Sequence, residues 1–352
     1  MTAGWYTPLE DDRLLCTLCP RACKLRDGQR GMCFVRERVG AEIVLSTYGR
    51  SSGFCIDPIE KKPLNHFLPG TPVLSFGTAG CNLACKFCQN HEISKSRSVD
   101  ATASEASPER IAQAALQAGC RSVAFTYNDP VIFYEYALDT AAACRALGVK
   151  SVAVTAGYLT EPARPGFFAA MDAANIDLKG FLPDFYRRLT GSEIEPVLET
   201  IAYAIQEART WVELTTLLIP GENDSEAEIE ALTTWVKETC GADTPLHFTA
   251  FHPDFRMMKH PKTPLETLLK AREIGLKAGL RHVYIGNAHH VAAQSTYCSG
   301  CGVRVIGRDW HQLSDWHLDD TGACTICHTP LPGVFDGPPG TWGRQRRPVK
   351  LA

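Results

Sequence analysis

Apolar and polar residues alternate along the middle of the chain with two different periods. Short apolar runs, typical of buried strands, occur at residues 73–76, 122–126, 151–155, 174–179, 211–217 and 246–251, with a last piece at 282–285. Between them, apolar residues recur at helical spacing over residues 108–118, 130–146, 196–208, 225–239 and 265–278. Strands that alternate with helices predict an α/β fold with a parallel sheet and helices outside it.

The six main strands belong to a predicted domain at residues 57–296. Right-handed crossovers between parallel strands would wind such a sheet into an open or closed barrel. Active sites in these folds lie at the carboxyl ends of the strands. The segment 80–90 follows the first strand directly, so we expect it at that end of the barrel.

The N-terminal segment, residues 1–56, lacks a periodic stretch long enough to bury a core. It contains four cysteines at the spacing C-x2-C-x3-C-x9-C, which are Cys16, Cys19, Cys23 and Cys33. Small segments of this kind usually fold around a metal. Four thiolates suit zinc or an iron–sulfur cluster, and we favour zinc slightly. Four reduced thiols without a metal are the alternative.

The C-terminal segment, residues 297–335, contains two C-x2-C knuckles formed by Cys298, Cys301, Cys324 and Cys327. Two facing knuckles make a tetrahedral four-thiolate site, so this segment is predicted to be a zinc-ribbon or rubredoxin-like module. The tail at residues 336–352 is rich in glycine, proline and arginine and is expected to be flexible.

The overall composition limits the classes of function. A net charge of −3 argues against a broad nucleic-acid-binding surface, and no apolar run approaches the length of a membrane span. Eleven of the fifteen cysteines fall into three groups, and the N-terminus does not resemble a signal peptide. Grouped cysteines without an export signal indicate metal ligands in a reducing, cytoplasmic compartment.

The third cysteine group lies in the segment after the first strand. Cys81, Cys85 and Cys88 have the spacing C-x3-C-x2-C. A cubane iron–sulfur cluster normally takes four cysteines, one for each iron, so three cysteines imply an iron with an open position. An open metal position is typical of catalytic sites. The alternative is a zinc or structural site that takes a distant fourth ligand, for which His91 is the nearest candidate.

This spacing, with Phe87 just before the last cysteine, resembles the radical S-adenosylmethionine (radical SAM) enzymes. Further stretches extend the resemblance to relatives of the pyruvate formate-lyase activating enzyme, and most closely to the radical SAM member of the AmmeMemoRadiSam system; they are residues 57–65, 125–130, 176–180, 218–224 and 284–287. The resemblance implies a partial (β/α)6 TIM-like barrel, a [4Fe–4S] cluster, and S-adenosylmethionine (SAM) bound at the open iron. It also implies reductive cleavage of SAM to a 5′-deoxyadenosyl radical that abstracts hydrogen. Flavodoxin or ferredoxin would supply the electron. The substrate implied is a glycyl-radical enzyme, another protein or a small molecule.

The same resemblance suggests which residues position SAM. Phe87 would lie near the adenine, and Thr155 near the ribose or carboxylate. Asn128 and Asp129 replace the family's Gly-Gly-Glu segment, although a turn and a helix cap would equally explain this pair.

Asp177 and Lys179 share one face of the fourth strand, since strand side chains alternate with period two. They resemble the Asp-x-Lys element with which glycyl-radical activating enzymes contact SAM. A buried salt bridge without a SAM contact is the alternative.

A rival of a different class remains. The two outer cysteine groups would also suit a metal-stabilised module that binds nucleic acid or protein without SAM chemistry. Metal analysis and the absorbance of anaerobically purified protein distinguish the two hypotheses.

Overall fold

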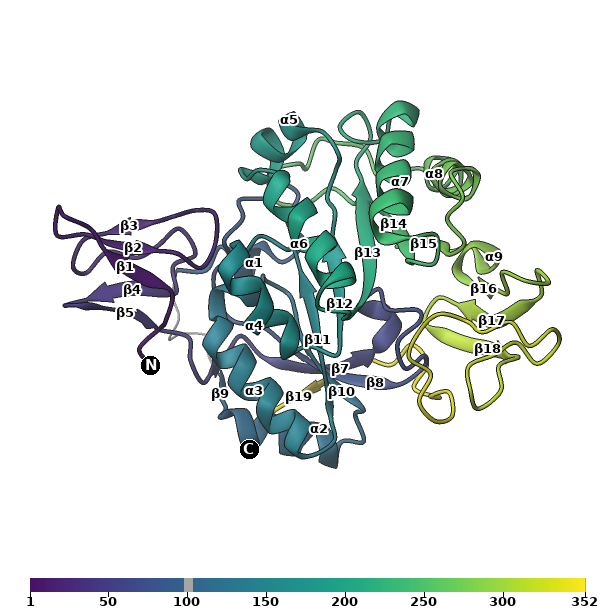
Figure 1. Cartoon of the computed structure of the whole chain (residues 1–352), viewed down its shortest axis with the longest axis horizontal. Helices are drawn as coiled ribbons and strands as arrows, with labels where there is room; N and C mark the ends of the chain where they lie inside the picture. Colours follow the sequence, from purple (N-terminus) through teal and green to yellow (C-terminus); the bar gives the residue numbers. More distant parts are fainter. Residues whose placement is uncertain (98–103, 352) are drawn as a thin grey trace.

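The structure is a computed structural model that describes residues 1–97 and 104–351. An N-terminal module, a central α/β domain and a C-terminal module lie in a row (Figure 1). The predicted metal-binding segments therefore flank the barrel on opposite sides.

The central sheet contains nine strands within the described residues, in the order β15-β14-β13-β12-β11-β10-β8-β7-β19. Seven of them run parallel and follow one another along the chain: β8 (Pro72–Phe76), β10 (Ser122–Phe125), β11 (Lys150–Thr155), β12 (Ala173–Asp177), β13 (Trp211–Leu218), β14 (Leu246–Ala250) and β15 (Val283–Gly286). The predicted parallel sheet of six main strands and one shorter strand is confirmed. Since β15 and β19 are the two edges, the barrel is partial.

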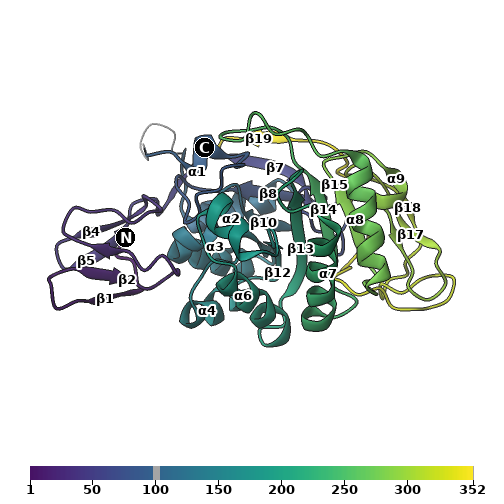
Figure 2. The same cartoon turned by 90° about the horizontal axis from the view of Figure 1, so that it is seen from above.

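The helices pack around the outside of this sheet (Figure 2). The longer ones are α2 (Pro108–Gln117), α3 (Tyr134–Ala146), α6 (Glu195–Gln206), α7 (Glu226–Cys240) and α8 (Leu265–Lys277). The shorter ones are α1 (His91–Ser94), η2 (Pro130–Phe133), η3 (Glu161–Ala163), α4 (Arg164–Ala169), α5 (Pro183–Phe185), η4 (Tyr186–Thr190) and α9 (Val291–Gln294). Ser107 and Ser225 cap α2 and α7, because each side chain accepts a hydrogen bond from a backbone N–H of the first helical turn.

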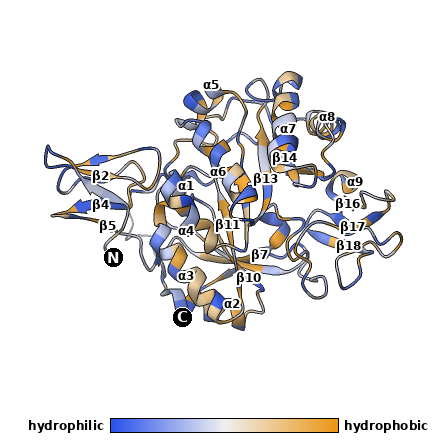
Figure 3. Ribbon diagram, in the orientation of Figure 1, coloured by the Kyte–Doolittle hydropathy of each residue, from blue (hydrophilic) through white to orange (hydrophobic). Residues whose placement is uncertain are grey.

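The helices are amphipathic, with one polar face and one apolar face. Hydrophilic and hydrophobic residues alternate along them, whereas the central strands are largely hydrophobic (Figure 3). In α2 the buried residues are Pro108, Ile111, Ala112 and Ala115, which follow helical spacing. These residues bury one face of the helix in the central core.

The tail, expected to be flexible, contains a short strand. Residues Arg347–Val349 form β19, which pairs antiparallel with β7 (Phe54–Pro58), and β7 in turn pairs antiparallel with β8. Upstream of β19, a Cβ on Gly70 would meet the carbonyl oxygen of Gly340 at 2.3 Å. The glycines of the tail therefore allow close backbone approach, and β19 covers an edge strand that would otherwise expose unpaired backbone groups.

The N-terminal module consists of short strands. One sheet contains β1 (Tyr6–Pro8), β2 (Leu14–Cys16) and β3 (Lys24–Leu25), and a hairpin contains β4 (Arg36–Val39) and β5 (Glu42–Leu45). A separate pair joins β6 (Arg50–Ser51) to β9 (Ser104–Glu105). The buried Arg36 forms an ion pair with Glu135 of α3, which ties the module to the barrel.

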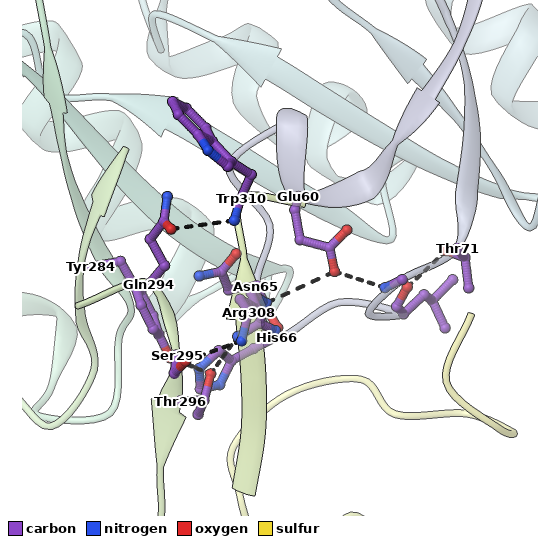
Figure 4. A network of polar contacts seen from close by, with 12 residues as sticks. Glu60, Asn65, His66, Thr71, Tyr284, Gln294, Ser295, Thr296, Arg308 and Trp310 are labelled. Atoms are coloured by element: carbon purple, nitrogen blue, oxygen red, sulfur yellow. Dashed lines mark hydrogen bonds and ion pairs between the residues drawn. The ribbon is translucent and has the colours of Figure 1, made fainter. Parts of the chain in front are cut away.

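The C-terminal module is a three-stranded sheet of β16 (Thr296–Tyr297), β17 (Arg304–Asp309) and β18 (Gln312–Trp316). Arg308 of β17 is 1% exposed and donates to the carbonyl oxygen of Asn65 and to Oγ1 of Thr296, both at 2.6 Å (Figure 4). Glu60 lies in the same network and accepts a hydrogen bond from the backbone N–H of Gly70. A buried polar network therefore joins this module to the loop between β7 and β8.

That loop also closes the barrel near the start of β13. The carboxylate of Glu213 accepts hydrogen bonds from the backbone N–H groups of Asn65 and His66 and contacts Nε2 of His247 at 2.7 Å. Burial raises the pKa of Glu213, but the His247 contact and the backbone N–H groups outweigh it and lower the pKa to about 2. The closed end lies opposite the carboxyl ends of the strands, which stay accessible.

Candidate active site

A cavity of about 400 Å³ lies at the carboxyl ends of the parallel strands. All of the predicted cluster and SAM residues line it: Cys81, Cys85, Phe87, Cys88, Asn128, Asp129, Thr155, Asp177 and Lys179. They come from the loop after β8 and from the ends of β10, β11 and β12. One cavity therefore brings together residues almost 100 positions apart in the sequence.

Hydrogen bonds along its length hold the loop that carries the three cysteines. The backbone N–H groups of Ala84 and Lys86 donate to the carbonyl oxygens of Thr190 and Leu189, at 2.8 and 2.9 Å. Nζ of Lys95 donates to the carbonyl oxygen of Leu83 at 2.6 Å. These bonds shape the loop independently of any metal.

The three thiols fit an iron–sulfur cluster with one open iron. The cavity lining, as far as the structure describes it, contains no fourth cysteine and no histidine. His91, the nearest alternative ligand, stacks on Phe255 and pairs with Asp254. The donor set is therefore three soft thiolates, which suits a [4Fe–4S] cluster with an unligated corner.

Burial makes the thiols of the cysteine loop harder to deprotonate. Burial raises the pKa of Cys85 to about 12, and the positive charge of Lys179 opposes this rise. The hydroxyl of Ser94 lies 3.1 Å from Sγ of Cys88 and can donate to a thiolate there. The sequence carries no motif that identifies Ser94, because the contact depends on how α1 folds back on the loop.

Asn128 lines the cavity, but its amide is used by the protein. Its Oδ1 accepts from the backbone N–H of Thr78 at 3.2 Å. Its Nδ2 donates to Oγ1 of Thr78 and to the carbonyl oxygen of Gly80, at 3.1 and 2.9 Å. Asn128 therefore positions the start of the cysteine loop.

A hydrogen bond between Asp129 and Thr155, called the Asp129–Thr155 strap below, links the ends of β10 and β11. The carboxylate of Asp129 accepts from the backbone N–H of Val131 and of Ala156, and from the hydroxyl of Thr155 at 2.9 Å. Burial raises the pKa of Asp129, while the hydrogen bonds oppose the rise. The helix-cap alternative for Asp129 is thus observed, in a residue that also faces the cavity.

Asp177 and Lys179 form an ion pair of 2.7 Å at the cavity wall. Burial lowers the pKa of Lys179, but the charge of Asp177 outweighs this and raises the pKa above its usual value. The backbone N–H of Lys179 donates to the hydroxyl of Tyr186. Asp177 is 31% exposed at its side chain, so its carboxylate can still accept from a ligand.

Phe87 is 4% exposed and packs against Phe185, with ring centroids 6.0 Å apart. Its ring forms part of the cavity wall beside the cysteines. This is the apolar surface that the predicted adenine contact requires.

Lys61, Lys62 and Tyr127 add a cationic region to the same cavity. Nζ of Lys61 and Nζ of Lys62 donate to the two oxygens of Asp57, at 2.9 and 2.8 Å, and the hydroxyl of Tyr127 donates to Asp57 as well. In the sequence, only the charged residues at 57–62 mark this region. Their position in the cavity cannot be read from the sequence, because it depends on the antiparallel pairing of β7 with β8.

The outer cysteine groups lie elsewhere. The Sγ atoms of Cys298, Cys301, Cys324 and Cys327 all lie within 4.8 Å of one another. The N-terminal four, Cys16, Cys19, Cys23 and Cys33, line a small separate cavity. The described part of the chain contains no helix long and apolar enough to cross a membrane.

Three cysteines at the carboxyl ends of a partial α/β barrel, with no fourth cysteine or histidine among the described residues of the cavity, suit a radical SAM enzyme. Comparisons with known proteins agree. Residues 76–232 match the family model described as the radical SAM superfamily. The chain is 38% identical over 326 residues to an uncharacterized protein of Methanocaldococcus jannaschii, which covers 92% of this chain and 97% of that protein. The chain therefore belongs to the radical SAM superfamily.

Two further matches are more partial. A probable GTP 3′,8-cyclase of Methanosarcina mazei is 30% identical over 158 residues, 43% of this chain and 46% of that enzyme. Among solved structures, Streptococcus suis SuiB bound to its precursor peptide SuiA superposes with a TM-score of 0.50 at 16% identity, over 66% of this chain and 52% of SuiB. The second match shows a shared fold. Superfamily membership makes this chain an enzyme that uses an iron–sulfur cluster and SAM.

Proposed function

We propose that Cys81, Cys85 and Cys88 hold a [4Fe–4S] cluster at which SAM is cleaved reductively, and that a hydrogen atom is then abstracted from a substrate in the same cavity. The bound cluster and SAM would supply a 5′-deoxyadenosyl radical as the hydrogen-abstracting species. The observation that carries the proposal is one cavity in which three thiols face a polar wall at the strand ends, with no fourth cysteine or histidine among its described lining residues. A metal-stabilised binding module would not need that open position, and superfamily membership does not favour this rival.

The residues around the three thiols would bind SAM or hold the site in place. Asp177 and Lys179 present one carboxylate and one ammonium group, which suit the ammonium and carboxylate of SAM. Phe87 supplies an apolar surface for the adenine, and Asn128 and the Asp129–Thr155 strap keep the loop and the strand ends in place. The walls around the cavity would exclude water from a reactive radical. A low-potential flavodoxin or ferredoxin is the proposed reductant.

Release of 5′-deoxyadenosine from SAM by anaerobically reconstituted, reduced protein tests this function. We expect Cys88→Ala to lower the rate at least about 100-fold, because one of three iron ligands is lost. Cys240→Ala, at the end of α7 and outside the three cysteine groups, should leave the rate unchanged. Cleavage at the wild-type rate in the Cys88→Ala protein would refute the ligand assignment.

We also propose that the substrate carries an anionic group, which binds near Lys61 and Lys62. Two ammonium groups share the single carboxylate of Asp57, so one positive charge in this group is unmatched. Lys62 is 3% exposed and has three N–H donors; Asp57 accepts one, and the ring of Tyr127 lies with its centroid 4.9 Å from the ammonium nitrogen. The remaining donors of a buried ammonium group need acceptors, and a carboxylate or phosphate in the cavity would provide them. The GTP on which the cyclase relatives act, by their names, is one anion of this kind.

Binding of sodium tripolyphosphate and of citrate, measured by isothermal titration, distinguishes a phosphate from a carboxylate. We expect Lys61→Gln to weaken binding of the preferred anion about tenfold, as for the loss of one charge-assisted hydrogen bond. Lys277→Gln is the matched control, since Lys277 pairs with Glu273 on the outside of α8. If neither anion binds, or if both variants bind like the wild type, the anionic substrate is ruled out.

A further inference from the structure

The cysteine groups of this chain show two different geometries. In the C-terminal group, the Sγ atoms of Cys298 and Cys327 are 3.4 Å apart, and those of Cys301 and Cys324 are 3.8 Å apart. Four sulfurs at 2.3 Å from a tetrahedral zinc ion are separated from one another by about 3.8 Å. The sulfur atoms of the C-terminal group therefore have the separation expected of four thiolates that bind one zinc ion.

The N-terminal group does not have this spacing. Of the residues that the structure describes, only the C-terminal cysteines form a group compact enough to hold one metal ion. The sulfur atoms of the N-terminal four are thus not close enough together for one ion. The same holds for Cys81, Cys85 and Cys88, the ligands proposed for the iron–sulfur cluster. An iron–sulfur cluster spreads its thiolates further than zinc does, because each thiolate binds a different iron atom.

The N-terminal cysteines also surround a space. Cys16, Cys19, Cys23 and Cys33 line a small cavity whose other walls include Leu18, Val131 and Ile132. A Cβ on Gly31 would lie 3.6 Å from Sγ of Cys23 and 3.7 Å from Sγ of Cys33. Residue 31 therefore lies within contact distance of two of the thiols, and the apolar walls shield the space between them from water.

The charges around this cavity suit a negatively charged group. Arg21 and Arg36 line it; Arg36 is 2% exposed and its guanidinium also pairs with Glu135. The backbone N–H of Met32 points at Sγ of Cys23, with 3.5 Å between nitrogen and sulfur. Hydrogen bonds to cluster sulfurs and nearby positive charge raise the reduction potential of an iron–sulfur cluster, so such a group would accept an electron more readily.

The cavity directly adjoins the loop of the proposed catalytic cluster. Asn82, which follows Cys81, lines it, and the carbonyl oxygen of Asn82 accepts from Nε of Arg21 at 2.7 Å. A Cβ on Gly80 would meet the carbonyl oxygen of Cys33 at 2.0 Å, so the two cysteine loops touch backbone to backbone. The two cysteine loops are therefore in direct contact.

We propose that Cys16, Cys19, Cys23 and Cys33 hold a second [4Fe–4S] cluster, fully ligated by the protein, which passes electrons to the cluster at Cys81, Cys85 and Cys88. One electron enters from a reduced low-potential protein donor and one leaves for the catalytic cluster, so the second cluster returns to its starting state after each transfer. With all four irons ligated, it has no position for SAM. The relay function rests on the proposed function, whereas the identity of the bound group does not.

Iron, sulfide and zinc analysis of two proteins tests the identity of this group. We expect about eight irons and eight sulfides per chain in the wild type, and about four of each in the variant Cys81→Ala/Cys85→Ala/Cys88→Ala. That variant leaves the N-terminal module intact and should keep an iron–sulfur absorbance. Four irons in the wild type and none in the variant, with zinc bound at the N-terminal cysteines, would overturn the second cluster but leave the proposed function standing. Four irons in both proteins would instead overturn the proposed function.

The relay has its own test in the variant Cys19→Ser/Cys23→Ser. We expect the catalytic cluster, followed by electron paramagnetic resonance, to be reduced by a protein donor at least about tenfold more slowly. The signal that it gives after photoreduction with SAM should be unchanged, and circular dichroism would show that the variant is folded. Cys240→Ser is the matched control and should be reduced at the wild-type rate. Equal rates in the three proteins would contradict a relay through the N-terminal module.

Discussion

Single side chains in this site serve both the fold and the chemistry. The amide of Asn128 makes three hydrogen bonds with Thr78 and Gly80, the residues that lead into the cysteine loop. Its place after the second strand marked it as a SAM contact, and the sequence does not show that its amide is already occupied. Hydrogen-bond partners some fifty positions away are set by the fold, so they are invisible to local patterns.

The change Asn128→Asp tests this role. A carboxylate cannot donate to Thr78 and Gly80, and it places a buried negative charge beside the thiolates. We expect the free energy of unfolding to fall by about 2–3 kcal/mol and the iron content to fall with it. Gln206→Glu replaces an exposed amide that donates to Thr239, and should cost well under 1 kcal/mol. Denaturant titration and iron analysis measure both effects, and wild-type iron content in Asn128→Asp would show that the amide does not hold the loop.

Glu213 provides a pH prediction at the same scale. Its pKa in the folded protein, about 2, lies below its ordinary value of 4.5. The stability from this depressed pKa is therefore fully present above about pH 4.5, and it is lost as the pH falls toward 2. The shift corresponds to roughly 3 kcal/mol.

We expect Glu213→Gln to remove most of this dependence, so that the difference in unfolding free energy between wild type and variant shrinks as the pH falls from 5 to 3. Chemical denaturation at several pH values measures it. A constant difference across that range would mean that Glu213 titrates normally in the folded protein.

At the scale of elements, the parallel strands and the main helices could be predicted because each follows its own periodicity. The apolar runs at 73–76 and 151–155 became β8 and β11, and the helical patterns at 108–118 and 225–239 became α2 and α7. β7 and β19 escaped prediction because Asp57, Pro58 and the arginine-rich tail look like loop when read locally. Their pairing depends on an edge of the sheet that exists only after folding.

Deletion of residues 346–352 tests the contribution of β19. The deletion removes the three paired residues Arg347, Pro348 and Val349 and uncovers the edge of β7. We expect a loss of about 1–3 kcal/mol in stability and a tendency to self-associate through the exposed edge. Arg347→Ala, which keeps the backbone pairing, is the control and should remain monodisperse. Thermal unfolding and size-exclusion chromatography give the two readouts, and a truncated protein that behaves like the control would show that β19 is dispensable.

At the scale of the whole molecule, the two cysteine-rich modules are attached differently. The N-terminal module touches the cysteine loop itself, whereas the C-terminal module is held through Arg308 to the far, closed end of the barrel. Cys301 and Cys327 are exposed, whereas Cys33 and Cys85 of the other two cysteine groups are buried, so a metal held by the C-terminal cysteines would be accessible to reagents.

We therefore expect a zinc-selective chelator to remove one zinc ion per chain while the iron content stays constant. The unfolding temperature should fall by several degrees, because metal binding contributes to folding of the module. Cys327→Ser should reproduce this loss without the chelator. A parallel loss of iron would show that the C-terminal module is coupled to the catalytic end of the barrel.

The position of β19 bears on how the protein is made. A ribosome synthesises residues 347–349 after the other eight described strands of the central sheet. These residues nevertheless pair with β7, the neighbour of β8, and β8 is the strand that leads into the cysteine loop. Until residues 347–349 leave the ribosome, the outer edge of β7 in the nascent polypeptide has no partner strand in this sheet. A transcript truncated before these codons would yield a product with that edge exposed.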